Sequence, residues 1–373
     1  MEKIINITIL LLLMSFSILN ARVIHSGEIH GEKYKIEHVA SGLSTPWGIE
    51  FIDEDTLIVS QKSGEIALLN LKDKTIKDLY NPIYVKNEGQ GGLLDVALSP
   101  NFARDKTIYF TYVKSIRGNG ATTLIKALFI NDDLKEYQEV FESKSLSDTT
   151  RHYGSRITFD KEGKIYFSVG ERGVRQNAQN TKNHAGSILK INADGTAPKD
   201  NPFVGNENVL DEIYSFGHRN PQGLFFDKKR DVLFSIEHGP RGGDEINIIK
   251  KGLNYGWPLV SHGKEYFSGS LVSEFSSKDG FEDPIKVYIP SIAPSSIISY
   301  SGKKFVQWSG FLFAGALKLQ HINIIRLDDK LKAIDEQRIA KTIRERVRDI
   351  TESPSGYIYF ITDSGNIYRI SPQ

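Results

Sequence analysis

Short apolar runs separated by turn residues make up most of the chain from about residue 33 onward. Residues 56–60, 107–113 and 164–169 are examples, each rich in Ile, Val, Phe, Tyr and Thr. Runs of this length and composition are typical of β-strands. Only residues 131–142 and 331–344 are polar and rich in Lys and Glu, and for these we predict a helix or an exposed loop. The pattern therefore predicts an almost all-β protein.

A strand, an acidic or glycine turn and a second strand recur along the chain. Such units start near Trp47, Leu93, Ile157, Gly223, Ser295 and Val347. Six units over about 350 residues give about 58 residues each, close to a four-stranded propeller blade with its loops. We therefore predict a single six-bladed β-propeller domain with four-stranded antiparallel blades over residues 22–373. One or two β-sandwiches are the alternative, but their strands would not be expected to recur in this order.

The first residues have the pattern of an export signal. A largely apolar run from Ile7 to Leu19 follows Lys3, and the small residue Ala21 closes it. This run is shorter than the ~20 residues that a membrane-spanning helix needs. We predict a cleaved signal peptide over residues 1–21, with an uncleaved anchor as the alternative. The mature chain would then be periplasmic or secreted, without a membrane span.

Charge and cysteine content exclude several classes of function. The chain has 47 Lys and Arg against 46 Asp and Glu, so no global positive field favours binding to nucleic acid. It has no Cys, which excludes disulfides, zinc–thiolate sites, iron–sulfur clusters and thiol nucleophiles. Any metal would be held by oxygen or imidazole, and the core must be stable without disulfides.

Candidate chemistry lies in loops next to strand ends, where binding groups concentrate on a rigid scaffold. Taken one at a time, these loops have ordinary explanations. His152 could be a hydrogen-bonded loop residue, residues 239–244 a turn, and Arg346 with Arg348 alternating charges on an edge strand. Gly, Pro, His, Arg and Asn are dense in residues 90–95, 151–156, 170–173, 217–223, 237–247, 254–258 and 291–296.

Several of these segments, taken together and in order, resemble a known family. Residues 200–203, 217–223, 237–247 and 254–258 are similar to motifs of the soluble sugar dehydrogenases that depend on pyrroloquinoline quinone (PQQ). The resemblance runs from about residue 43 to residue 370. It implies a six-bladed propeller that oxidises the C1 hydroxyl of aldoses to lactones by hydride transfer to the quinone. The electrons would pass on to an acceptor that the sequence does not identify.

The resemblance implies roles for individual residues. His152 matches the catalytic base, and an imidazole with a pKa near ~6.5 suits proton transfer at neutral pH. PQQ carries three carboxylates, which Arg can pair in a planar, bidentate way and Lys can attract as a point charge. The cofactor-binding positions implied by the resemblance are Gln90, Arg219, Asn220, Ser291, Lys318, Arg346 and Arg348.

The resemblance also implies calcium. The backbone carbonyls of Gly239 and Pro240 match ligands of a calcium ion that polarises the quinone. Glu245 and the Tyr255 carbonyl match ligands of a second, structural calcium. Hard oxygen ligands of this kind suit Ca²⁺.

Some positions depart from the glucose dehydrogenases within this family. Arg151 stands where those enzymes carry an acid, and Glu171 with Arg172 stands where an Asp-Gln pair touches the sugar. The chain also lacks their long insertions, so it is more similar to the aldose sugar dehydrogenases, with a more open site. The identity of the sugar therefore stays open.

Two other classes of function remain as alternatives. One is a noncatalytic propeller that binds a carbohydrate or a protein, since a fold alone does not decide function. The other is a calcium-dependent lactonase, which would need carboxylates and Asn at the channel. The combination of His152 with Arg219, Lys318, Arg346 and Arg348 favours the dehydrogenase, because a binding module needs no base.

Overall fold

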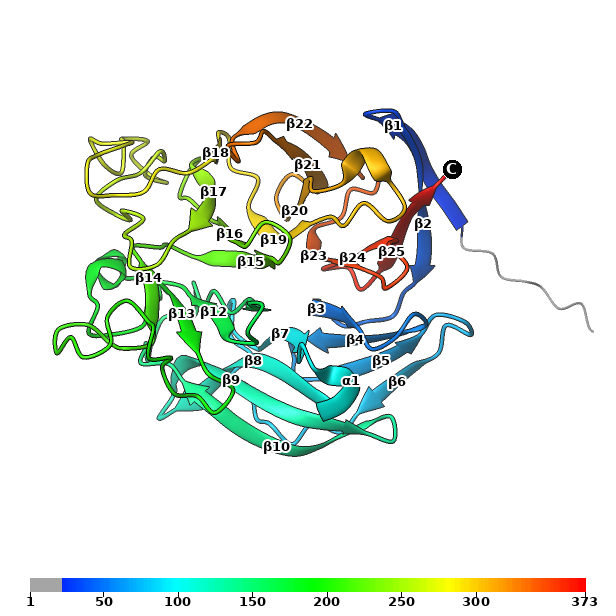
Figure 1. The fold of residues 1–373 in the computed structure, drawn as a ribbon, viewed down its shortest axis with the longest axis horizontal. Helices are drawn as coiled ribbons and strands as arrows, with labels where there is room; N and C mark the ends of the chain where they lie inside the picture. Colours follow the sequence, from blue (N-terminus) through cyan, green and yellow to red (C-terminus); the bar gives the residue numbers. More distant parts are fainter. Residues whose placement is uncertain (1–21) are drawn as a thin grey trace, which may run out of the picture.

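Strands that are buried on both faces form the inner part of six antiparallel sheets, arranged around a common axis (Figure 1). The computed structural model describes residues 22–373. Each sheet is one blade, which confirms the six-bladed β-propeller predicted from the repeat. The innermost strands begin within two residues of the predicted starts, at Pro46, Leu93, Ile157, Pro221, Pro294 and Val347.

The first three blades follow one another along the chain. Blade 1 contains β3 (Pro46–Phe51), β4 (Thr56–Gln61), β5 (Ile66–Asn70) and β6 (Ile76–Leu79). Blade 2 contains β7 (Leu93–Leu98), β8 (Thr107–Ile116), β9 (Asn119–Ile130) and β10 (Asp133–Glu142), with the short helix α1 (Phe102–Asp105) between β7 and β8. Blade 3 contains β11 (Ile157–Phe159), β12 (Ile165–Val169), β13 (Ser187–Ile191) and β14 (Ile213–Phe216), with the 3-10 turn η1 (Arg175–Gln179) after β12.

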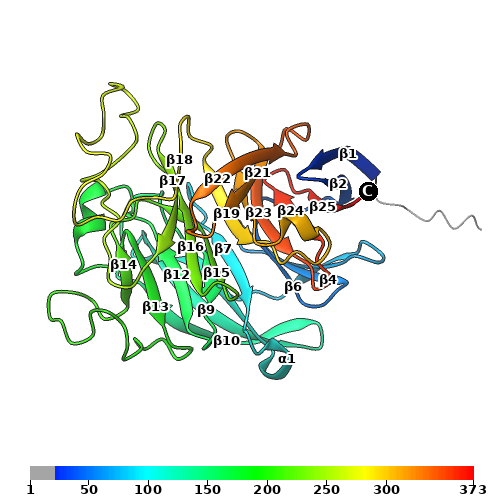
Figure 2. The same cartoon turned by 45° about the horizontal axis from the view of Figure 1, so that its top comes forward.

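The next two blades have the same order. Blade 4 contains β15 (Pro221–Asp227), β16 (Val232–Glu237), β17 (Asp244–Ile249) and β18 (Lys286–Tyr288). The long segment between β17 and β18 projects from the ring (Figure 2). Blade 5 contains β19 (Pro294–Ser299), β20 (Leu312–Ala316), β21 (His321–Leu327) and β22 (Ala333–Ile339), with the 3-10 turn η2 (Val306–Trp308) after β19.

The sixth blade closes the ring with strands from both ends of the described chain. Its inner strands are β23 (Val347–Glu352), β24 (Ile358–Thr362) and β25 (Ile367–Pro372), and its outer strands are β2 (Glu32–Ala40) and β1 (Arg22–Ile29). Strand β2 pairs with β25 in an antiparallel register that sets Tyr34 opposite Pro372. This blade therefore has five strands, not the predicted four.

The prediction of a helix or exposed loop for residues 131–142 and 331–344 was wrong. These segments contain β10 and β22, the outermost strands of their blades. An outermost strand pairs on one edge only, so its polar side chains can face water. Charged residues on such an edge also discourage pairing with another chain, which accounts for the Lys and Glu content.

Apolar side chains fill the space between neighbouring blades. Between blades 2 and 3, for example, Tyr109 packs against Phe159 with 5.5 Å between ring centroids. Burial of this kind around the whole ring replaces the disulfides that the sequence lacks. No helix within residues 22–373 is long and apolar enough to cross a membrane.

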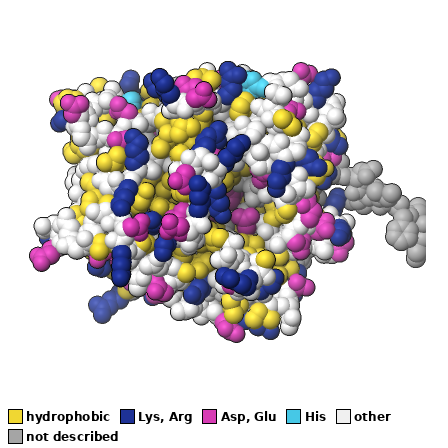
Figure 3. Space-filling model, in the orientation of Figure 1, with side chains coloured by type: hydrophobic (Ala, Val, Ile, Leu, Met, Phe, Trp, Pro, Cys, Tyr) yellow, Lys and Arg dark blue, Asp and Glu magenta, His cyan; other side chains and the backbone are white. Residues whose placement is uncertain are grey.

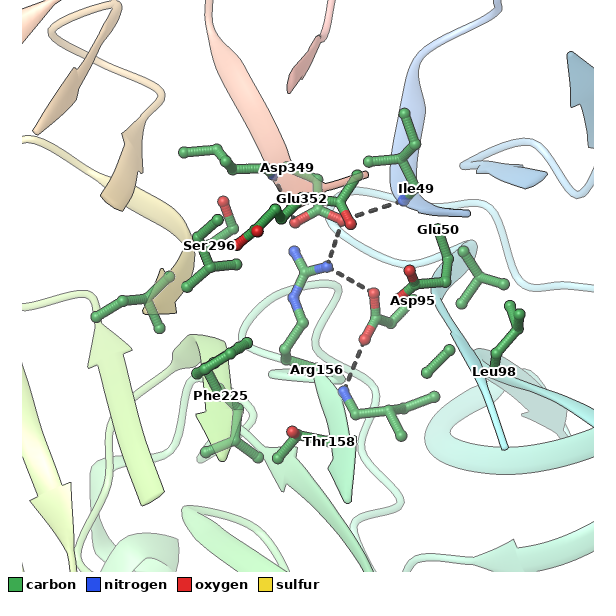
Figure 4. Close-up of a pocket in the computed structure, with 18 of the residues that line it drawn as sticks. Ile49, Glu50, Asp95, Leu98, Arg156, Thr158, Phe225, Ser296, Asp349 and Glu352 are labelled. Atoms are coloured by element: carbon green, nitrogen blue, oxygen red, sulfur yellow. Dashed lines mark hydrogen bonds and ion pairs between the residues drawn. The ribbon is translucent and has the colours of Figure 1, made fainter. Parts of the chain in front are cut away.

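The axis of the ring is occupied by one buried arginine, Arg156 (Figure 4). Its Nη1 donates to Asp95 of blade 2 at 2.5 Å and to Asp349 of blade 6 at 2.8 Å. Its Nε and Nη2 donate to the carbonyls of Gln222 (3.0 Å) and Ser295 (3.1 Å), at the inner strands of blades 4 and 5.

The same network reaches the remaining blade. The guanidinium of Arg156 lies 4.5 Å from the ring of Trp47 in β3, and Asp349 accepts a hydrogen bond from the Ile49 amide at 3.1 Å. A cavity of about 280 Å³ adjoins the network and is also lined by Glu50. Burial raises the pKa of Glu50 to about 7. Arg156 thus connects all six blades at their point of convergence.

Candidate active site

His152 lies in the loop that enters blade 3, and its position is fixed from two sides. Its backbone N–H donates to Oε1 of Gln90 at 2.8 Å, and its Nδ1 lies 2.5 Å from Oε2 of Glu171, which follows β12. The side chains of His152 and Glu171 are buried. The Nε2 atom makes no hydrogen bond within residues 22–373, so it is the free nitrogen of the ring.

The surroundings of His152 favour its neutral form. Burial lowers its pKa, the hydrogen bond that Nδ1 donates to Glu171 opposes this, and the positive charge of Arg219 lowers the pKa further. The carboxylate at Nδ1 fixes the ring so that Nε2 can accept a proton. The arrangement is that of a general base.

Two amides brace the loop that carries the base. Asn220 accepts a hydrogen bond from the Gly154 amide at 3.1 Å, and Gln90 holds His152 as described above. A side chain at Gly170 would lie 2.3 Å from the His152 carbonyl oxygen and 2.8 Å from Oδ1 of Asn220, so only glycine fits there. The NH₂ groups of both amides have no partner in the described part of the chain, and they stay available to a ligand.

Arg172 is fully buried behind this loop. Its guanidinium lies 3.4 Å from the ring centroid of Tyr153 and donates to the carbonyls of Thr149 (2.7 Å) and Arg151. The structure therefore gives Arg172 a role in holding the segment around the base. The sugar contact implied by the family resemblance stays a prediction, as it does for Glu171.

Arg219 lies on the other side of the base. Its Nη1 donates to the carbonyls of Gly239 (2.9 Å) and His238 (3.2 Å), and its guanidinium lies 5.3 Å from the Trp257 ring. No carboxylate forms an ion pair with it within residues 22–373. A buried guanidinium without a carboxylate suits an anionic ligand.

A cavity of about 750 Å³ opens next to Gly239. Its wall includes several residues implied in cofactor and calcium binding: Gly239, Pro240, Ser291 and Lys318. Other wall residues are Arg241, Lys264, His238 and His262, and no carboxylate contributes to it. The face of the molecule seen in Figure 3 likewise shows Lys and Arg gathered over the centre of the ring. We call this space the cationic cavity.

The turn at Gly239 is held by a buried carboxylate that the sequence prediction missed. Asp244 accepts hydrogen bonds from the Gly239 amide (2.9 Å), the Ser291 hydroxyl (2.6 Å) and the Ile292 amide (2.7 Å). Ser291 thus orients the wall of the cavity in this structure. Asp244 lies within the predicted segment 237–247, but nothing in its neighbours along the chain indicated its partners at Ser291 and Ile292.

Arg346 and Arg348 share one acidic partner, Asp363, which follows β24. The Nε atoms of Arg346 and Arg348 lie 2.6 and 2.8 Å from its carboxylate. Burial lowers the pKa of Lys62, and the positive charge of Arg348 lowers it further. Burial also lowers the pKa of His238, followed by the effects of Arg219, His152 and then Arg348. Arg348 therefore belongs to the same electrostatic neighbourhood as His238 of the cationic cavity, and the pair of arginines keeps a net positive charge.

Glu245 and Tyr255 meet around a small cavity that is also lined by Glu237. Burial and the neighbouring Glu237 carboxylate raise the pKa of Glu245 to about 8, and no Lys or Arg within residues 22–373 pairs with it. Oδ1 of Asn247, which is buried next to it, has no hydrogen-bond donor. Oxygen atoms that lack a cation fit the second calcium site implied by the sequence.

Side chains alone do not form a metal site in the described part of the chain. No group of three or more His, Asp or Glu residues there is arranged to hold a metal ion. Calcium at either position would therefore depend on backbone carbonyls, those of Gly239 and Pro240 at one site and that of Tyr255 at the other. Backbone carbonyls are common calcium ligands.

Known proteins share both the sequence and the fold. Residues 43–369 match the family model for Glucose / Sorbosone dehydrogenase. Aldose sugar dehydrogenase YliI of Escherichia coli is 34% identical, with 91% of this chain and 93% of the relative covered. Quinoprotein glucose dehydrogenase B of Acinetobacter calcoaceticus is 27% identical, with 91% and 87% covered.

Solved structures agree with these relatives. The apo form of the soluble aldose sugar dehydrogenase of Escherichia coli has a TM-score of 0.87 at 32% identity and covers 91% of this chain and 100% of its own. The PQQ-bound aldose sugar dehydrogenase of Streptomyces coelicolor has a TM-score of 0.76 at 27% identity and covers 92% and 99%. With the matched residues spanning nearly the whole ring, this chain belongs to the Glucose / Sorbosone dehydrogenase family.

Proposed function

We propose that the protein is a PQQ- and calcium-dependent aldose sugar dehydrogenase that converts the C1 hydroxyl of an aldose to the lactone. The observation that carries this proposal is the pairing of His152 with Glu171 close to Arg219 and to His238, a wall residue of the cationic cavity, which has no carboxylate in its wall. A base is needed to take the hydroxyl proton, and a cluster of cations is needed for a cofactor with three carboxylates.

The residues of this chain fit the cofactor. Lys318 lies in the wall of the cationic cavity and forms no ion pair within residues 22–373. Arg219, Arg346 and Arg348 would pair with the remaining negative charge, while the free NH₂ groups of Gln90 and Asn220 would donate to polar oxygens. When bound, PQQ would accept the hydride from C1, with calcium at Gly239 and Pro240 as a Lewis acid.

The chain's own part in the reaction is proton transfer and positioning. As the C1–H bond breaks, the bond between oxygen and hydrogen of the C1 hydroxyl breaks too, and Nε2 of His152 takes this proton. Glu171 stabilises the imidazolium that forms, because its carboxylate accepts a hydrogen bond from Nδ1. The C1–O bond becomes the carbonyl of the lactone.

The alternatives are less well supported. A lactonase would need metal-ligating carboxylates at the channel, but the axial carboxylates Asp95 and Asp349 are paired with Arg156, and no carboxylate lines the cationic cavity. A noncatalytic propeller would not need a buried His–Glu pair at its ligand site. We further propose export to the periplasm or the medium; the predicted signal peptide, residues 1–21, lies outside the described residues.

Reconstitution tests the proposal. Purified protein should oxidise glucose with an artificial electron acceptor only after PQQ and calcium are both added, and the product should be the lactone. The matched controls are a sample without PQQ and a sample without calcium after exhaustive chelation. Binding of PQQ without oxidation of any aldose would instead support a noncatalytic propeller.

A further inference from the structure

Two cations in the wall of the cationic cavity have no assigned role. Arg241 and Lys264 face each other across an isolated bridge, with hydrogen bonds from the Arg241 amide to the Lys264 carbonyl (3.1 Å) and from the Lys264 amide to the Arg241 carbonyl (3.2 Å). Both are exposed, and neither side chain forms an ion pair or hydrogen bond within residues 22–373. The backbone bridge thus brings two residues with unpaired positive charges next to each other.

The proposed cofactor does not need these two charges. Arg219, Lys318, Arg346 and Arg348 supply four positive charges, and Asp363 removes one by pairing with both Arg346 and Arg348. The three positive charges that remain already match three carboxylates, and the proposed calcium ion adds two more. Arg241 and Lys264 therefore remain as a surplus at the mouth of the site.

The acid next to Lys264 along the chain does not cancel this surplus. Glu265 follows Lys264, but its two oxygens lie 2.6 and 2.8 Å from Nη1 and Nη2 of Arg175. That bidentate pair neutralises Glu265 and ties the segment to η1. Lys264 is thus presented on an anchored segment, and its charge stays uncompensated.

The rest of this wall suits a sugar ring. Tyr266 lies in the wall of the cavity and is 57% exposed, so it can offer aromatic surface to a ligand. His262 lies in the same wall, and its buried Nε2 has no hydrogen-bond partner in the described chain. A few placed polar groups beside an aromatic surface are the usual composition of a small-molecule site.

We propose that the substrate is an aldose with an anionic group, a carboxylate or a phosphate, at a position remote from C1. Arg241 and Lys264 would bind that group, Tyr266 would pack on the ring, and His262 would bind a hydroxyl. The inference rests on the proposed function, because it places C1 at His152 and the anion at the mouth.

The test compares three sugars on the protein loaded with PQQ and calcium. Glucuronate, glucose 6-phosphate and glucose share the C1 hydroxyl and differ in charge. We expect kcat/KM to be at least ~10-fold higher for an anionic sugar than for glucose, mainly through KM, because charge-assisted hydrogen bonds are the stronger ones. The two anionic sugars decide between carboxylate and phosphate. Raising the salt concentration should reduce the preference.

Variants test whether the preference for an anionic sugar comes from Arg241 and Lys264. Arg241→Gln and Lys264→Gln should each lower the ratio of kcat/KM for the anionic sugar over glucose by at least ~5-fold, and the double variant should lower it further. Lys278→Gln is the matched control: this lysine lies on the same projecting segment but outside the cavity wall, and the ratio should not change.

The outcomes separate the two proposals. If glucose is oxidised as well as the anionic sugars, and the variants leave the ratio unchanged, the inference is overturned while the dehydrogenase stands. If no sugar is oxidised, the dehydrogenase itself fails. In that case, calorimetric titration of glucuronate and of glucose into the protein shows whether Arg241 and Lys264 select an anionic sugar. Equal affinities for the two sugars would overturn the inference.

Discussion

At the scale of single residues, the account depends on His152. Replacing it with Gln should reduce turnover by ~10²–10⁴, the usual contribution of a positioned general base. PQQ affinity should stay within a few-fold, because the contacts proposed for the cofactor come from other residues. Lys161→Ala, on the surface, is the control. Equal losses of turnover and of PQQ affinity would mean that His152 is structural.

The pH dependence of the same residue gives a second prediction. Burial lowers the pKa of His152, so the midpoint of its titration lies below the ordinary ~6.5. Above that pH the imidazole is neutral and the rate of quinone reduction is maximal. The rate should fall as the pH is lowered through that midpoint, since protonated imidazole cannot accept a proton.

Glu171→Gln tests the assignment of that midpoint. The Glu171 hydrogen bond raises the pKa of His152, so its removal should shift the midpoint to lower pH and also reduce the maximal rate. The profile is measured as the rate of quinone reduction between pH 4 and pH 8, values chosen to bracket ~6.5. If the midpoint does not move in the variant, the group that titrates is not His152.

At the scale of elements, β23 tests the cofactor site. Arg348→Ala should weaken PQQ binding by at least ~30-fold, because a carboxylate of the cofactor would lose a charge-assisted hydrogen bond in a partly buried site. Lys161→Ala should bind PQQ like the unmodified protein. Titration with PQQ in calcium buffer, followed by the absorbance of the bound quinone, gives both affinities. If the two variants bind alike, Arg346 and Arg348 are only an edge pair held by Asp363.

The elements also show what a sequence pattern can predict. Inner strands such as β12 and β24 are buried on both faces, so they appear as continuous apolar runs, and their positions were predicted. The outer strands β10 and β22 carry mostly polar side chains, and their pattern differs little from that of an exposed helix. The carboxylates Asp244 and Asp363 were missed because their partners come from other elements.

At the scale of the whole molecule, the axial arginine links the blades into one structure. Arg156→Met should lower the free energy of unfolding by ~3–5 kcal/mol, because Asp95 and Asp349 would stay buried without their partner. Urea unfolding measures this change. Adding Asp95→Asn and Asp349→Asn to the same protein should recover part of the loss. An unchanged unfolding midpoint for Arg156→Met would show that the network does not stabilise the ring.

The way in which the ring closes could not be predicted from the sequence, because the strands that pair there are far apart along the chain. The number of blades follows from local repeats, but the pairing of β2 with β25 joins residues more than 300 positions apart. No local pattern specifies such a register, so a fifth strand in the last blade was not expected. The Arg156 network is equally non-local, because each of its partners comes from a different blade.

The central claim is that the bound quinone receives hydride from C1 of an aldose. The most direct test is a single turnover without oxygen, in which the protein loaded with PQQ and calcium is mixed with glucose, or with the anionic sugar it prefers, and the quinone spectrum is recorded. The account predicts reduction of the quinone, slower with sugar deuterated at C1 and much slower in His152→Gln. A spectrum that shows bound quinone unchanged by every aldose would contradict it.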